Sequence, residues 1–169
     1  MKKIILLLII IFYSCSNKNE TNETTFNEIK ELTIFHINDQ HGKIGNFSKI
    51  QHIIKTEKQL NDVLFVCGGD VFSGNPVVDN HTEKGFPMID LMNKVGVDVA
   101  VIGNHEFDYG QNILKDRFTQ SNFDWVCANV TMNSTGVPEP NKYITKTVND
   151  LKITFLGLVE TNGSENETI

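Results

Sequence analysis

Short apolar runs alternate with amphipathic segments along most of this 169-residue chain. Runs rich in β-branched residues predict buried strands at residues 31–38, 63–67, 97–102 and 124–128. Between these runs, apolar side chains recur at helical spacing, which predicts helices that begin near residues 46, 85 and 113. Gly96 follows the second helical pattern and is a predicted C-cap. Strands that alternate with helices of about a dozen residues predict βαβ units and a mainly parallel sheet.

A different pattern follows Val130. Tyr143–Val148 and Lys152–Val159 are rich in β-forming residues, and Asn149-Asp150 between them is typical of a hairpin turn. The sequence therefore predicts that the parallel sheet passes into antiparallel strands. We expect an α/β fold without internal repeats.

Residues 1–14 form a separate unit. The basic pair Lys2-Lys3 precedes an unbroken apolar run of ten residues, Ile4–Tyr13. A helical membrane span needs about twenty apolar residues, so this run is typical of a secretory signal peptide. It ends at Ser14-Cys15-Ser16, which resembles the lipobox of bacterial lipoproteins. We therefore expect lipid on Cys15 and a membrane anchor in the cell envelope, on the periplasmic or surface face of the outer membrane. The alternative is an ordinary secretory signal with a chance cysteine.

Composition narrows the range of partners. Residues 15–30 are polar and almost free of apolar side chains, so they predict a tether rather than a packed segment. Removing Lys2 and Lys3 with the leader leaves 13 of the 15 basic residues against 21 acidic ones, a net charge near −8. A nucleic-acid polymer requires a basic surface, so it is not an expected partner. Nucleotides stay possible because bound divalent cations supply positive charge locally.

Two cysteines lie inside predicted strands, Cys67 and Cys127. Apolar surroundings favour buried thiols that pack as small hydrophobic groups. A disulfide between them is the alternative in an exported protein.

Polar side chains with metal-binding chemistry follow the first three predicted strands. The segments are Asn38-Asp39-Gln40-His41-Gly42, Gly68-Gly69-Asp70 and Gly103-Asn104-His105-Glu106-Phe107-Asp108. The carboxyl ends of adjacent parallel strands meet at one edge of a sheet, so we expect these segments to lie together. Carboxylate and amide oxygens with imidazole are ligands that borderline divalent metals prefer. A single Asp after a strand is commonly a helix N-cap, but caps do not require histidines at these spacings. The sequence predicts a metal-dependent hydrolase.

These segments resemble the first three motifs of the calcineurin-like metallophosphoesterases, and the fuller stretches resemble the 5′-nucleotidase branch of that family. The resemblance covers residues 31–160. It implies a partial four-layer α/β/β/α sandwich and two divalent metal ions, such as Zn²⁺ or Mn²⁺. It also implies that the substrate is a nucleotide or another small phosphoester, in a reaction of the 5′-nucleotidase, UDP-sugar hydrolase or 2′,3′-cyclic phosphodiesterase type.

The resemblance implies a set of metal ligands. Asp39 and His41 would ligate the first metal, Asn104 would ligate the second, and Asp70 would bridge both. In two-metal sites the cations lie about 3.5–4 Å apart and stabilise the charge on the phosphoryl oxygens.

The resemblance also implies two catalytic residues. His105 would stabilise the transition state and assist departure of the leaving group. Asp108 would hold the other ring nitrogen of His105, which sets its tautomer and raises its basicity. Glu106 is predicted to be a structural hydrogen-bond partner of the same loop.

Members of the family complete the second half of the metal site with histidines from later motifs. No histidine follows His105 in this sequence, which ends at Ile169. We therefore expect residues 31–169 to be the N-terminal part of a phosphoesterase domain, with an incomplete second metal site and impaired activity. The alternative is a non-catalytic surface lipoprotein that binds a metal or a partner.

Overall fold

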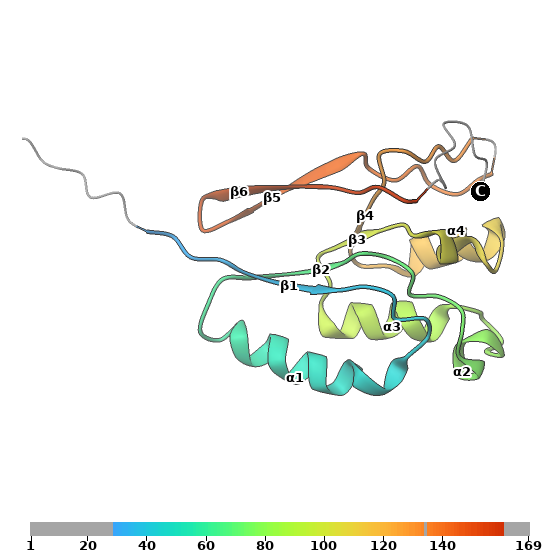
Figure 1. Cartoon of the computed structure of the whole chain (residues 1–169), viewed down its shortest axis with the longest axis horizontal. Coiled ribbons are helices and arrows are strands. Elements are labelled where there is room, and N and C mark those ends of the chain that lie inside the picture. The colour runs from blue at the N-terminus through green and yellow to red at the C-terminus, as the bar shows by residue number, and fades with distance from the viewer. Residues whose placement is uncertain (1–28, 134, 161–169) are drawn as a thin grey trace, which may run out of the picture.

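The computed structural model describes residues 29–133 and 135–160 (Figure 1). The predicted signal peptide, Cys15 and nearly all of the predicted tether lie outside these residues, so they stay predictions. No helix among the described residues is long and apolar enough to cross a membrane. The described residues include almost all of the segment that carries the family resemblance.

A parallel sheet forms the centre of the fold. Its strands lie side by side in chain order and are β1 (Thr33–Ile37), β2 (Val63–Cys67), β3 (Val99–Val101) and β4 (Asp124–Val126). The register places Ile37 opposite Cys67 and Val101 opposite Val126. β4 is shorter than predicted because the N–H of Ala128, which would continue the pairing with β3, donates to the carbonyl of Gly157 (2.8 Å). The strand ends line up along one edge, as predicted.

Helices follow the strands at the predicted positions. They are α1 (Phe47–Glu57), α3 (Phe86–Val95) and α4 (Gln111–Gln120). α1 and α3 lie on one face of the sheet (Figure 1), where fully buried side chains such as Phe65, Met92 and Ala100 form the core. Gly96 ends α3 in the left-handed conformation (φ 78°), and its N–H donates to the carbonyl of Met92 (3.1 Å). The predicted C-cap is confirmed.

Three short helical segments were not predicted. They are η1 (Ile44–Asn46), α2 (Pro76–Asp79) and η2 (Asn104–Phe107). η1 and η2 are 3₁₀ turns, which are too short to show a hydrophobic period. α2 carried a readable signal, because Asn75 at the N-cap precedes Pro76 at the first helical position. The Asn75 side chain accepts a hydrogen bond from the N–H of Val77 (2.9 Å).

An antiparallel hairpin lies over the sheet on the side away from α1 and α3 (Figure 1). Its strands are β5 (Tyr143–Val148) and β6 (Leu151–Leu156). Asn149 and Asp150 both have positive φ, 48° and 60°, as a two-residue hairpin turn requires. The predicted hairpin is confirmed, although β6 ends before Val159. The parallel sheet with its antiparallel pair confirms the α/β class and the change from parallel to antiparallel strands.

Of the cysteines that the structure describes, Cys67 and Cys127 are both buried and free. Burial raises the pKa of the Cys67 thiol to about 12. The predicted buried thiols are confirmed, and the disulfide alternative is wrong for these two residues.

Candidate metal centre

Three metal-binding side chains converge at the carboxyl edge of the sheet. Asp39 and His41 follow β1, and Asp70 follows β2. One ligand atom from each residue lies within 4.8 Å of the others. His41 Nε2 is 3.9 Å from Asp39 Oδ1. Two carboxylates and an imidazole at this spacing fit a borderline divalent cation such as Zn²⁺ or Mn²⁺.

Backbone hydrogen bonds hold the first two loops together. The N–H of Asp39 donates to the carbonyl of Gly69 (3.1 Å), and the N–H of His41 donates to the carbonyl of Asp70 (3.0 Å). Asp39, His41 and Asp70 all have positive φ, at 51°, 43° and 54°. Such conformations are uncommon outside glycine and cost about 1–3 kcal/mol each when the backbone is strained. The strain coincides with the three residues whose side chains meet.

The third loop, which follows β3, contacts the second loop, which follows β2, through the Asp70 carboxylate. The N–H of His105 donates to Asp70 Oδ1 (3.0 Å). A Cβ atom on Gly103 would lie 2.2 Å from the same oxygen. Asn104 lies between these two residues at the start of η2, and its side chain is exposed. The structure therefore places the backbone of Asn104 beside the Asp70 carboxylate.

The close approach of Gly103 to Asp70 supports a prediction. Gly103→Ala should lower the free energy of unfolding by about 1–3 kcal/mol, because the new methyl group overlaps the carboxylate. Gly45→Ala is the matched control, since a Cβ atom built there points into open space. Urea denaturation of both variants measures the difference, and equal stabilities would show that the third loop can move away from Asp70.

The Glu106 side chain connects the second and third loops. It is fully buried. Oε2 accepts from the N–H groups of Asp70 (2.9 Å) and Gly103 (2.6 Å), and Oε1 accepts from the N–H of Val71 (2.7 Å). Burial raises the pKa of the Glu106 carboxyl, while these backbone N–H groups oppose that rise. The predicted structural role of Glu106 is confirmed.

His105 and Asp108 form a hydrogen-bonded pair beside the metal-binding group. His105 Nδ1 lies 2.8 Å from Asp108 Oδ2. The ring of His105 meets the ring of His41 edge-on, with centroids 4.5 Å apart. The hydrogen bond to Asp108 raises the pKa of the His105 imidazole. Partial burial opposes ionisation of Asp108, but hydrogen bonds from Ser73 and His105 outweigh it and lower the pKa of the Asp108 carboxyl.

A family model described as calcineurin-like phosphoesterase matches residues 32–159, which include every loop of this centre. The chain belongs to this family. The family membership that the motifs indicated is therefore confirmed, together with the fold class.

Several phosphoesterases are similar to this chain. It is 32% identical over 129 residues to a 2′,3′-cyclic-nucleotide 2′-phosphodiesterase/3′-nucleotidase of Haemophilus influenzae, covering 67% of this chain and 20% of that protein. It is 30% identical over 140 residues to a 5′-nucleotidase of Vibrio cholerae, covering 76% of this chain and 25% of that protein. The NAD nucleotidase structure of H. influenzae superposes with a TM-score of 0.68 at 26% identity, over 78% of this chain and 30% of that one. The chain thus spans about a fifth to a quarter of the length of these two curated relatives.

Three further polar residues belong to the hydrogen-bond network around Asp108 and were not predicted from the sequence. Ser73 Oγ donates to Asp108 Oδ2, and the N–H of Ser73 donates to Tyr109 Oη (2.9 Å). Tyr109 in turn donates to Asp79 Oδ1. Their hydrogen-bond partners lie 30 to 36 residues away in the chain, so no local pattern could reveal them.

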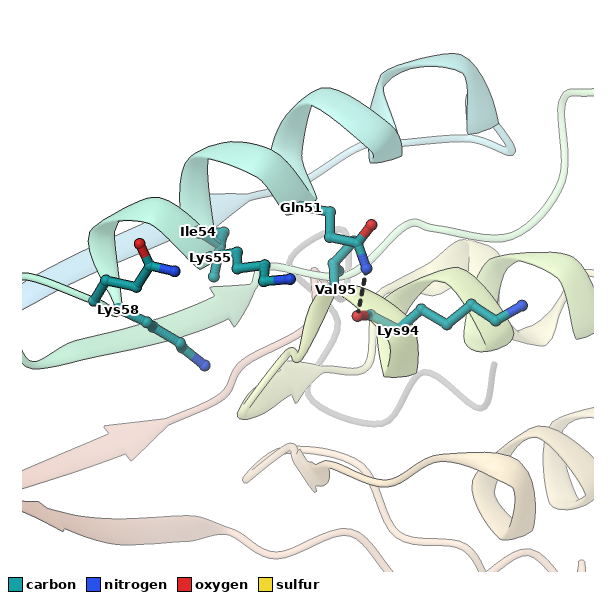
Figure 2. Close-up of a pocket in the computed structure, with 7 residues that line it drawn as sticks. Gln51, Ile54, Lys55, Lys58, Lys94 and Val95 are labelled. Atoms are coloured by element: carbon teal, nitrogen blue, oxygen red, sulfur yellow. Dashed lines mark hydrogen bonds between the residues drawn. The ribbon is translucent and has the colours of Figure 1, made fainter.

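A hollow of about 390 Å³ lies between the C-terminal parts of α1 and α3 (Figure 2). Its lining residues are Gln51, Ile54, Lys55, Lys58, Gln59, Lys94 and Val95. Each helix returns the chain to the start of the next strand, so this hollow is at the opposite edge of the sheet from the metal-binding group. Lysines in a last turn stabilise the negative end of a helix. The Gln51 side chain donates to the carbonyl of Lys94 (3.1 Å).

Proposed function

We propose that this chain forms part of a metal-dependent phosphoester hydrolase that acts on nucleotides. The observation that carries the proposal is the convergence of Asp39, His41 and Asp70 within 4.8 Å, inside the segment that matches the family model. The names of similar proteins support the substrate class, since they include a cyclic-nucleotide phosphodiesterase/3′-nucleotidase and a 5′-nucleotidase.

The proposed metal ligands come from all three loops. Asp39, His41 and Asp70 would hold a divalent cation, and Asp70 and Asn104 would contribute to a second one. The position of Asn104 beside the Asp70 carboxylate supports this assignment. Bound divalent cations would stabilise the negative charge on the phosphoryl oxygens and activate water for attack on phosphorus.

His105 is the proposed residue at the leaving group. Its Nδ1 is engaged by Asp108, so Nε2 is the nitrogen that is available to a substrate. A neighbouring carboxylate that holds Nδ1 sets the ring orientation and favours the protonated form. His105 can therefore donate a proton to the departing oxygen or stabilise its charge.

Calorimetric titration of the full chain with Mn²⁺ tests the metal assignment. Asp70→Asn should weaken Mn²⁺ binding at least about tenfold, because an amide replaces the charged oxygen between the loops. Asp150→Asn is the matched control, since its carboxylate is 89% exposed at the tip of the hairpin. Equal Mn²⁺ affinity for wild type and Asp70→Asn would contradict the assignment.

A further inference from the structure

We propose that Ser73 is a positioning residue that orients the Asp108–His105 pair and is itself held in place by Tyr109 and Asp79. The catalytic consequence rests on the proposed function, in which His105 serves the leaving group. The hydrogen-bond network stands independently of it and can be measured in the protein without substrate.

One oxygen of the Asp108 carboxylate has two hydrogen-bond partners. This Oδ2 atom accepts from Ser73 Oγ and lies 2.8 Å from His105 Nδ1. The side chains of Asp108 and His105 are each 38% exposed, so packing alone does not fix them. A second donor on the same oxygen restricts the carboxylate to one rotamer. The imidazole that bonds to this carboxylate is then restricted as well.

The backbone of Ser73 has an uncommon conformation and a hydrogen bond of its own. It has a positive φ of 46°, which is uncommon for a residue with a side chain. The N–H of Ser73 donates to Tyr109 Oη (2.9 Å), which holds the Ser73 backbone in place. The strained conformation is therefore held by a hydrogen bond to Tyr109, the residue that follows Asp108.

The Tyr109 hydroxyl accepts one hydrogen bond and donates another. It has one proton, which it donates to Asp79 Oδ1, so its lone pairs are available to accept from Ser73. Burial and the hydrogen bond to Asp79 raise the pKa of Tyr109, so the hydroxyl keeps its proton. The other Asp79 oxygen accepts from the N–H of Gly74 (3.2 Å). The Tyr109 ring stacks on Phe72, with centroids 5.8 Å apart. The network thus connects α2 to His105, with Ser73 donating to both Tyr109 and Asp108.

Nuclear magnetic resonance of the full chain tests the network. Two-bond ¹H–¹⁵N correlation spectra of labelled histidine report which nitrogen of His105 carries the proton and how fast that proton exchanges with water. At a pH where the imidazole is neutral, wild type should show His105 with its proton on Nδ1. Ser73→Ala should raise the exchange rate of this proton about fivefold, as expected for loss of one side-chain hydrogen bond, and should increase the Nε2–H tautomer.

Two further variants separate the hydroxyl from the backbone. Glycine adopts positive φ without strain, so Ser73→Gly would retain wild-type exchange if the Ser73 backbone alone mattered. We expect Ser73→Gly to behave like Ser73→Ala. Tyr109→Phe should also raise the exchange rate of the His105 Nδ1 proton. This variant provides a second test if the Ser73 variants do not fold. Ser48→Ala, at an exposed position of α1, is the matched control.

The outcomes are distinct from those for the metal centre. Unchanged exchange and tautomer in both Ser73→Ala and Tyr109→Phe would overturn the positioning role. Mn²⁺ affinity of Ser73→Ala should equal that of wild type, because the Ser73 hydroxyl bonds to Asp108 and Ser73 is not one of the three converging ligands. Absence of Mn²⁺ binding in wild type would overturn the proposed function and leave the hydrogen-bond network to be judged by exchange alone.

Discussion

Glu106→Gln is expected to lower the free energy of unfolding by about 2–4 kcal/mol. The buried carboxylate accepts hydrogen bonds from the N–H groups of Asp70, Val71 and Gly103, and both of its oxygens are used. Glutamine retains one accepting oxygen and turns an NH₂ group toward at least one backbone N–H. That N–H is then buried without an acceptor, and two donors face each other. Urea denaturation measures the loss.

Glu139→Gln is the matched control for this prediction. Glu139 also accepts a backbone hydrogen bond, from the N–H of Met132 (2.8 Å), but its side chain is exposed. Water can replace that bond, so the control should lose less than about 1 kcal/mol. A similar loss in both variants would mean that burial of Glu106 does not matter to the junction of the two loops.

His105→Asn is expected to lower kcat by about 100-fold or more, with metal content retained. The substitution removes the group that donates a proton or stabilises charge at the leaving oxygen. His105 contacts Asp108 and His41, but it is not among the three residues that converge as metal ligands. A suitable assay uses a chimaera in which residues 32–159 replace the matching segment of the V. cholerae 5′-nucleotidase, with a nucleoside 5′-monophosphate as substrate.

Asp108→Asn in the same chimaera should be milder, with a loss of about tenfold, because it disturbs the orientation and basicity of His105 without removing the ring. His52→Asn is the matched control, since His52 is exposed on α1. Metal analysis of each variant accompanies the kinetics. Full activity in His105→Asn, or loss of its metal, would contradict the assigned role.

The sequence was sufficient to predict most secondary structure elements. The predicted bounds of β2 match the observed Val63–Cys67, and Gly96 and the Asn149-Asp150 turn have the backbone conformations that were expected. These features depend on residues within a few positions of one another, so their pattern is visible locally. The convergence of Asp39, His41 and Asp70 was also predictable, because parallel strands joined by helices place their carboxyl ends at one edge.

Only the tertiary structure decided which polar atoms meet. Glu106 and Asp108 are carboxylates two residues apart, yet they differ in burial. The Glu106 side chain is fully buried and accepts from backbone N–H groups, whereas the Asp108 side chain is 38% exposed and pairs with His105. Ser73 and Tyr109 lie 36 residues apart in the chain but share a hydrogen bond. Burial and hydrogen bonds of this kind arise from the way the loops after β2 and β3 pack together. The sequence by itself therefore determined the elements and the candidate ligands, while packing between distant loops decided how those side chains are held.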